Sequence, residues 1–392
     1  FSEKLWPEGS GGELATYLIL KLLASTGDFN LEVYTSTRNP AKIPGASIRT
    51  VGFLRASNKV KLFVNILASR RFVEKAIERV DTVYIPRFSY PIIPVAKRLG
   101  KKVIVHLHGY QPVSYTAIIL YSEAEKPMRD FKRTFMIEYA SKPLTITLAS
   151  ALATPLMRLI RKWVGAADRI ICVSQRHEEI ILRSAPEYEK RITTIYNPPP
   201  EIPAIDKNLF EKPTLLYVSG DSFVKGFHVL LQALRILGRQ RFRNFELFVT
   251  GNYENRSLKV LNSLKNRYGL DIKVLGRINH EEILKLHSKA WALLLPSISE
   301  ETMSYAAVEA AMSGTLPVSS QVGALPEIFS DTPAEAFFFR PSCPSCLVDK
   351  IVEVTSMDRE EIASIGNKLR RIMTDKFDKN VIKKMLVKVF EE

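Results

Sequence analysis

The sequence predicts an α/β protein with two doubly wound, parallel-sheet domains that face each other across a cleft. Three observations support this fold class. Short apolar runs alternate with helical patterns along the chain, which is typical of a parallel sheet with helices on both faces. Prolines at 198–200 and 203 interrupt the alternation near the middle of the chain. The 392 residues also suffice for two separate hydrophobic cores.

The first predicted domain comprises residues 1–196. Its predicted elements are a helix at 12–24, a strand at 31–34, a helix at 60–79, a strand at 82–85, a helix at 94–99, a strand at 103–107, helices between 129 and 164, and a strand at 169–173. No apolar run precedes the glycines at 11 and 12, so we expect this domain to lack its first strand. Functional residues are expected in the loops that follow the strands, where ligands of parallel sheets bind.

Residues 197–213 are the predicted linker, since a proline-rich segment fits neither a helix nor a central strand. The second domain, 214–375, resumes the alternation. It has predicted strands at 214–218, 245–249, 273–275, 291–295 and 316–319, and predicted helices at 227–237, 258–267, 281–289 and 303–312. We expect a last helix, within 376–392, to pack back on the first domain.

Basic residues concentrate in the first half of the chain. The sequence has 56 Lys and Arg against 41 Asp and Glu; residues 1–200 hold 30 and 17 of these, a net charge of +13, which leaves +2 for the rest. Such a field attracts nucleic acids, anionic lipid headgroups or phosphorylated substrates. Because no zinc-finger, RNP-type or basic-zipper signature accompanies the charge, we expect no nucleic-acid partner.

The three cysteines, Cys172, Cys343 and Cys346, are too few for a disulfide scaffold. Cys343 and Cys346 form one CxxC motif without the second pair that a structural zinc site requires, so we expect a surface loop that can oxidise. The most apolar stretch, 143–157, is shorter than the about 20 residues that span a bilayer. We therefore predict a cytoplasmic protein whose membrane contact, where present, is peripheral.

Two segments are candidate membrane anchors. One is the predicted helix that begins near residue 59. Its apolar stripe consists of Val60, Phe63, Val64 and Leu67, with Lys59, Asn65, Ser69 and Arg70 mostly off it. This pattern fits either a helix that covers the sheet and exposes a basic face, or a helix that docks on the inner face of a membrane. The other candidate is 143–157, which is followed by Arg158, Arg161 and Lys162.

Glu301 and Glu309 suggest a site for an extended anionic ligand. The apolar run 291–295 predicts a buried strand, followed by a helix whose cap is Thr302 or Ser304. Glu301 then lies just ahead of the helix and Glu309 two turns inside it, roughly 10 Å further along the axis. Free backbone amides at the helix N-terminus favour a phosphate between the two carboxylates. The alternative is that the glutamates only complement the helix dipole.

The residues around this pair resemble a known family. The runs 274–278 (Val-Leu-Gly-Arg-Ile), 300–320 (beginning Glu-Glu-Thr-Met-Ser-Tyr) and 322–328 (Val-Gly-Ala-Leu-Pro-Glu-Ile) are similar to the donor-binding half of the retaining, GT-B-fold group 1 glycosyltransferases of family 4 type. The resemblance implies two Rossmann-like domains and a nucleoside diphosphate sugar as co-substrate, whose sugar passes to a hydroxyl acceptor with retention. It implies no cofactor. Because the sequence lacks an Asp-x-Asp motif, we expect no metal ion.

The resemblance also implies roles for individual residues. The catalytic candidates are His108 beside the donor sugar, Lys225 beside the diphosphate and Glu301 on the sugar hydroxyls, while Glu309 would bind the ribose. The other donor-binding candidates are Gly11, Gly12, Gly220, Arg277, Thr302, Met303, Ser304 and Tyr305. The family usually has an arginine near the position of Gly220, so either Lys225 acts with Arg277 or the diphosphate clamp is weaker. Asn197 matches a family asparagine that glycine normally follows.

Two other functions remain open. A GT-B-fold sugar-nucleotide epimerase is disfavoured by the two glutamates. A catalytically degenerate nucleotide-sugar-binding protein is favoured by the missing arginine. The expected partners are a nucleotide sugar donor, a glycan or lipid-linked acceptor, and an anionic membrane surface that the basic first half of the chain would contact.

Overall fold

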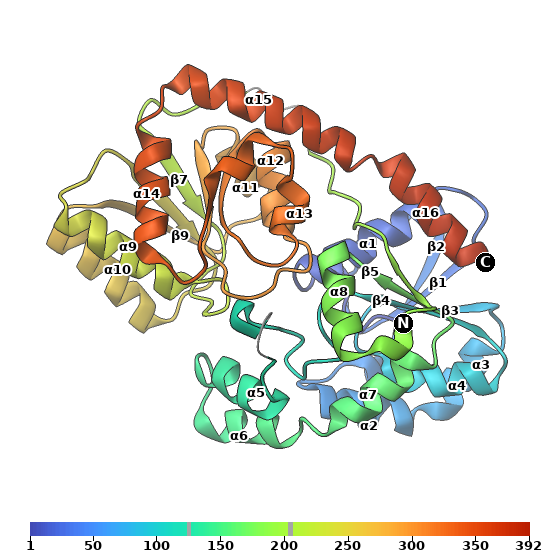
Figure 1. Ribbon diagram of the computed structural model, residues 1–392. Coiled ribbons are helices and arrows are strands. Elements are labelled where there is room, and N and C mark those ends of the chain that lie inside the picture. The colour runs from blue at the N-terminus through green and yellow to red at the C-terminus, as the bar shows by residue number, and fades with distance from the viewer. Residues whose placement is uncertain (124–126, 203–206) are drawn as a thin grey trace.

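The computed structural model describes residues 1–123, 127–202 and 207–392 and shows two α/β domains (Figure 1). The N-terminal domain has a four-stranded parallel sheet of β3 (Thr82–Ile85), β4 (Lys102–Leu107), β5 (Arg169–Cys172) and β6 (Ile192–Thr194), in that order. Beside it, β1 (Leu31–Thr35) and β2 (Ala46–Thr50) form a two-stranded parallel sheet. The first two residues lie between the sheets, because Ser2 bridges Thr35 and the ammonium of Phe1 donates to the Tyr84 carbonyl at 3.0 Å.

The helices of this domain begin at residues suited to capping them. Asn58 and Ser174 each accept a hydrogen bond from a backbone amide of the first turn of α2 and α8. Ser10 and Glu13 form a capping box at the start of α1. The helices are α1 (Gly11–Ala24), α2 (Lys59–Ala68), α3 (Arg70–Ile77), α4 (Ile93–Arg98), α5 (Asp130–Tyr139), α6 (Leu144–Leu152), α7 (Leu156–Gly165) and α8 (Gln175–Ser184).

The C-terminal domain has a six-stranded parallel sheet in the order β12-β11-β10-β7-β8-β9. Its strands are β7 (Thr214–Tyr217), β8 (Glu246–Thr250), β9 (Asp271–Gly276), β10 (Ala292–Leu295), β11 (Leu316–Ser320) and β12 (Phe338–Phe339). Every residue of β7, β8, β10 and β11 is buried, as expected for strands covered on both faces. Its helices are α9 (Phe227–Arg239), α10 (Asn255–Tyr268), α11 (His280–His287), α12 (Tyr305–Met312), α13 (Leu325–Phe329), α14 (Pro344–Thr355), α15 (Arg359–Lys376) and α16 (Lys379–Glu391).

The strand order places a ligand crevice in this second sheet. From β7 the chain proceeds outward to β8 and β9 on one side, and from β10 to β11 and β12 on the other. The order therefore reverses between β7 and β10, which pair directly. A reversal of this kind leaves a crevice at the carboxyl ends of the two strands. The loops that enter it are 218–226 and 296–304, which carry Lys225 and Glu301.

The chain returns to the N-terminal domain at its end (Figure 1). Helix α15 runs along the C-terminal domain, and α16 lies on the N-terminal one (Figure 1). Lys102 of β4 donates from Nζ to the carbonyls of Val389 and Phe390 at 3.0 and 2.8 Å. Between the two helices, the ring of Phe377 meets that of Tyr196, the residue after which the chain leaves the N-terminal domain, at 5.3 Å. The two connections between the domains therefore touch.

A short antiparallel bridge also joins the domains near the crevice. Leu120, in the loop between β4 and α5, pairs with Ser299. The amide of Tyr121 donates to the carbonyl of Ile298 at 2.9 Å, and the amide of Glu300 donates to that of Ile119 at 2.8 Å. The segment directly before Glu301 is thus held by the first domain.

The structure corrects the predicted orientation of α2. Leu62, Phe63 and Ile66 are its buried residues, whereas the predicted stripe residues Val60, Val64 and Leu67 are 44%, 59% and 52% exposed. Both sets lie at helical spacing, so the sequence alone could not say which face meets the core. Lys59, expected on a solvated face, instead lies over the rings of Phe88 and Tyr115. Burial lowers the pKa of Lys59 to about 8.

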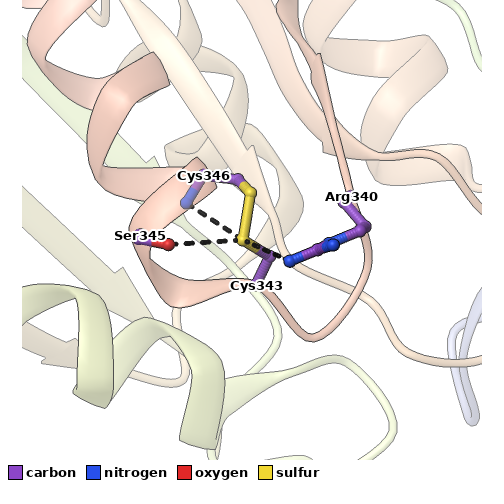
Figure 2. Close-up of a disulfide and its surroundings, with 4 residues drawn as sticks. All are labelled: Arg340, Cys343, Ser345 and Cys346. Atoms are coloured by element: carbon purple, nitrogen blue, oxygen red, sulfur yellow. Dashed lines mark hydrogen bonds between the residues drawn. A yellow bond between two sulfur atoms is a disulfide. The ribbon is translucent and has the colours of Figure 1, made fainter.

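Cys343 and Cys346 form a disulfide at the start of α14 rather than lying in a loop (Figure 2). Cys343 is the N-cap and is buried, and its sulfur accepts a hydrogen bond from the amide of Cys346 at 3.2 Å. Figure 2 shows the guanidinium of Arg340 reaching the same sulfur, at 3.7 Å. The disulfide therefore links the N-cap of α14 to the first turn of this helix, which packs on α9.

Candidate active site

A cavity of about 320 Å³ lies between the two domains. The N-terminal domain contributes Gly11 and Gly12 at the start of α1, and His108 just after β4. The loop after β7 contributes Ser219 and Lys225, and the loop after β10 contributes Ser297 and residues 301–304. Tyr305 and Ala306 complete this wall at the start of α12. Nine of the twelve predicted site residues thus line one cavity, and Gly220, Arg277 and Glu309 do not.

The N-termini of two helices line the cavity. Ser304 is the N-cap of α12, and its hydroxyl accepts a hydrogen bond from the amide of Ala307. Of the two caps that the sequence allows, Thr302 and Ser304, the second is therefore used. Across the cavity, Gly11 and Gly12 are the first two residues of α1. Unpaired amides and the dipoles of both helices favour negative charge at this position.

The glycines at the start of α1 allow this close approach. A Cβ on Gly11 would lie 3.3 Å from the ring of Tyr305 on α12. A Cβ on Gly12 would lie 2.7 Å from the guanidinium of Arg87 and 3.6 Å from His108 Cβ. Arg87 in turn pairs with Glu13 of α1 at 2.7 Å. Side chains at these two positions would therefore narrow the cavity or displace its support.

Lys225 and Glu301 form an ion pair in the cavity wall. Lys225 Nζ lies 2.8 and 2.7 Å from the two carboxylate oxygens of Glu301, and the Ser297 hydroxyl donates to the same carboxylate. Glu301 is buried, whereas 40% of the Lys225 side chain is exposed toward the cavity. The ammonium is thus oriented by protein on one side and left open to a ligand on the other.

Gly323 fixes the backbone of Glu301. Its φ of +55° lies in the left-handed region, and a Cβ there would come within 2.2 Å of both the Glu301 amide nitrogen and its carbonyl oxygen. The adjacent amide of Ala324 donates to that carbonyl at 2.7 Å. The run 322–328 is one of those that resemble the family, but its sequence did not indicate that Gly323 contacts Glu301.

His108 lies in the cavity wall as a neutral imidazole. Burial, with the neighbouring His106 and Arg87, holds the pKa of His108 well below its usual value. Neither of its ring nitrogens has a partner among the described residues, and its ring stacks on that of His106 at 4.5 Å. The Thr302 hydroxyl donates to the His108 carbonyl at 3.1 Å, which links this histidine to the loop before α12. A ligand hydroxyl is the natural partner for such an unpaired imidazole.

Glu309 is buried behind the cavity wall and does not line the cavity. Its carboxylate lies 3.0 Å from Nε2 of His280, and this hydrogen bond raises the pKa of the imidazole. Trp6 meets the His280 ring edge-on at 6.4 Å. Sequence reasoning missed both His280 and Trp6. The signal for His280 was its place two residues after the resembling run 274–278, at the start of α11.

Two other predicted residues stand outside the cavity. Gly220 has a φ of +60° and packs against the backbone of Asn252, so it shapes the turn after β7. Arg277 is exposed just after β9. Lys225 forms its ion pair with Glu301, so the expectation that it acts together with Arg277 on a diphosphate stays a prediction. Asn197 does line the cavity, and its buried side-chain oxygen has no hydrogen-bond partner within the described part of the chain.

Comparison with known proteins agrees with this geometry. Residues 9–198 match the family described as Glycosyltransferase Family 4, and residues 201–372 match Glycosyl transferases group 1. No curated protein matches the chain by sequence. The chain does share its fold with solved structures at low sequence identity.

Three solved structures illustrate this likeness. Sucrose-phosphate synthase from Thermosynechococcus elongatus is 16% identical, with a TM-score of 0.72 over 98% of this chain and 93% of that one. HepE from Anabaena, in complex with UDP-glucose, is 17% identical, with a TM-score of 0.69 over 100% and 98%. WaaG, a glycosyltransferase involved in lipopolysaccharide biosynthesis, is 14% identical, with a TM-score of 0.65 over 98% and 96%.

The fold class predicted from the sequence is confirmed, since both α/β domains align with these solved structures over nearly the whole chain. The two family matches together cover the cavity and both domains that form it. The chain is therefore a GT-B-fold glycosyltransferase and belongs to the group 1, family 4-type glycosyltransferases.

Proposed function

We propose that this glycosyltransferase moves a sugar from a nucleoside diphosphate sugar to a hydroxyl acceptor, with retention at the anomeric carbon. The observation that carries the proposal is the meeting of two helix N-termini and the Lys225 ammonium in one cavity. That arrangement suits a diphosphate, whose charge increases when the bond to the sugar breaks. UDP-sugars are the first donors to test, because HepE was solved with UDP-glucose.

Each residue has a chemical role in this scheme. Lys225 and the amides of Met303, Ser304 and Tyr305 stabilise the negative charge of the leaving diphosphate. Glu301 accepts hydrogen bonds from sugar hydroxyls, while neutral His108 hydrogen-bonds the sugar or its phosphate. The C1–O bond to the diphosphate breaks as the acceptor oxygen attacks from the same face. The acceptor proton passes to a phosphate oxygen of the leaving group, so no protein nucleophile is required.

Glu309 is assigned to the ribose hydroxyls. The carboxylate is held by His280, and the ribose would take the place of this histidine or share the carboxylate with it. The edge-on contact of Trp6 with His280 places an aromatic side chain of the N-terminal domain near this end of the site. Closure of the two domains would therefore complete the nucleoside end of the cavity.

The proposed acceptor is a glycan or a lipid-linked hydroxyl compound at the inner face of a membrane. The support is the net charge of +13 in residues 1–200, which form most of the N-terminal wall of the cleft. A metal ion is not part of the proposed reaction, because Lys225 and the helix N-termini supply the positive charge.

Incubation of the full-length protein with UDP-sugars, with and without a lipid extract, tests the proposal. Release of UDP only in the presence of extract supports transfer, and the anomeric coupling constant of the product, measured by NMR, reports retention. Release of UDP without an acceptor would indicate hydrolysis, and conversion of the donor into its epimer without release of UDP would indicate epimerisation. Donor binding without any turnover, unchanged in Glu301→Ala, would identify a degenerate binding protein.

A further inference from the structure

Helix α6 presents apolar side chains to solvent. The helix contains no charged residue, and only Thr147 and Ala151 are buried. Its exposed side chains include Leu144 at 52%, Ile146 at 49%, Leu148 at 42% and Leu152 at 70%. A helix of a soluble domain normally buries its apolar face and exposes its polar one, and here a threonine faces inward while leucines face outward. An apolar surface of this kind marks an interaction site.

Other helices of this domain also expose apolar side chains. Helix α5, which packs on α6, exposes Phe131, Met136 and Tyr139. Helix α2, which meets α7 through the rings of Phe63 and Trp163 at 5.6 Å, exposes Val60, Val64 and Leu67. All four helices lie along the lower edge of the N-terminal domain in Figure 1. We call the exposed side of α5 and α6, residues 130–152, the apolar hairpin.

The stretch of chain around the apolar hairpin is basic. Residues 127–165 hold seven Lys and Arg and two Asp and Glu, a net charge of +5. Both acidic residues already have partners, since Asp130 pairs with Arg133 and Glu138 with Lys142. The exposed cations are Arg129, Lys132, Lys142, Arg158 and Lys162. Exposed apolar side chains and exposed cations on the same stretch of chain match the chemistry of an anionic lipid surface, with acyl chains beneath phosphate headgroups.

The length of these helices favours a surface over a span. No single described helix is long and apolar enough to cross a bilayer, and the pair α6 and α7 reaches that length only with a bend of 51°. Ile160 and Val164 of α7 are buried in the domain, so this helix is already engaged with the protein. The apolar hairpin is therefore suited to the interface and not to the interior of the bilayer.

The apolar hairpin is also linked to the catalytic loop. Arg133 of α5 is buried and donates from Nε to both oxygens of Glu123 at 2.8 Å. Glu123 in turn accepts the amide hydrogen of Leu120 at 3.0 Å, and Leu120 pairs with Ser299, two residues before Glu301. A continuous set of buried contacts thus joins the hairpin to the backbone beside the active site.

We infer that the apolar hairpin docks on an anionic lipid bilayer and that docking further stabilises the segment 298–300 beside Glu301, which the first domain already holds in place. Docking would bring a lipid-linked acceptor to the cleft. It would also make the stability of the loop 296–304 depend on contact with the membrane. Docking of the apolar hairpin on lipid does not depend on the proposed function. An effect of docking on turnover does rest on the proposed function.

Vesicle flotation with the full-length protein tests docking. We expect binding to vesicles of phosphatidylcholine with phosphatidylglycerol, weaker binding at high salt, and little binding to phosphatidylcholine alone. The double variant Leu148→Asp, Leu152→Asp should bind at least tenfold more weakly. The matched control is Val381→Asp, Met385→Asp, which changes two exposed apolar residues of α16 (56% and 42% exposed) and should bind as wild type. Circular dichroism checks that both variants stay folded.

Three results would overturn docking: equal binding by both double variants, no binding by the wild type, or a wild-type dimer in solution that becomes monomeric in the α6 variant. The last result would assign the surface to a second copy of the chain.

Hydrogen exchange tests the link to the active site. Amides of 298–300 should exchange more slowly with anionic vesicles present in the wild type and the α16 control, and unchanged exchange in vesicle-bound protein would refute the link. Vesicle binding without turnover on any donor would leave docking intact and refute the proposed function instead.

Discussion

Gly323→Ala tests whether the backbone position of Glu301 sets the reaction rate. The new Cβ would lie 2.2 Å from the Glu301 nitrogen and oxygen, whereas ordinary contacts begin near 3.4 Å, so one side must move by about 1.2 Å. A displacement of about 1 Å at a catalytic group can lower the rate about 100-fold. The left-handed φ adds about 1–2 kcal/mol of destabilisation for any residue with a Cβ. We therefore expect both a slower enzyme and a less stable one.

Gly27→Ala is the matched control for this change. Gly27 has a φ of +79°, and a Cβ added there would meet no atom of the described residues within 4 Å, so this variant carries the backbone cost without the clash. Urea unfolding and UDP release should be measured for both variants. Gly27→Ala should lose about 1–2 kcal/mol of stability at unchanged kcat. Equal stability losses in the two variants, with equal kcat, would refute the argument that Gly323 holds Glu301 in place.

The contacts of Lys225, His280 and Glu123 yield three further predictions. Lys225→Met should lower kcat by about 100-fold to 1000-fold, since it removes the positive charge beside the leaving group, and a rate within threefold of wild type would count against that role. The pKa of His280 is raised in the folded protein by its hydrogen bond to Glu309, so the pair stabilises the fold fully below pH 6.5 and loses this effect as the pH rises through the raised pKa. His280→Gln should remove that pH dependence from the unfolding midpoint, and an unaltered profile would assign it elsewhere. Glu123→Ala should cost about 1–3 kcal/mol in urea unfolding, because it removes the buried carboxylate that pairs with Arg133 and leaves Asp130 as the remaining carboxylate partner of the guanidinium, and a loss below about 0.5 kcal/mol would show that solvent reaches this pair.

The sequence was most informative where burial leaves little choice. The apolar run at 291–295 predicts a buried strand because it is short and Pro296 ends it, and β10 spans Ala292–Leu295. Parallel strands then place the loops after β7 and β10 at one edge, which brings Lys225 to Glu301 across 76 positions of sequence. Three strands were missed: β6 and β12 have three and two residues, too few to form a pattern, and none of the residues of β2 is buried, so it has no apolar run.

Other features depend on contacts that periodicity does not encode. The exposed face of α2 could not be identified because apolar residues occur on two sides of the helix. Gly323 contacts Glu301 and His280 contacts Glu309, which lie 22 and 29 positions away in the sequence. Whether such residues meet depends on how the loops fold. The bridge between Leu120 and Ser299 joins two loops without regular structure, for which the sequence carries no period at all.

The contact between Tyr196 and Phe377 has a mechanical consequence. Both chain connections between the domains pass this point, so the domains are tethered covalently along one edge of the cleft and meet elsewhere through non-covalent contacts such as the bridge between Leu120 and Ser299. Two domains connected by two segments at one edge can open and close about that edge as a hinge. The second connection prevents one domain from rotating freely relative to the other, as it could about a single linker. The Glu301 wall and the His108 wall should therefore separate most at the edge away from this pair, which makes that edge the route by which a bulky donor enters and its nucleotide leaves.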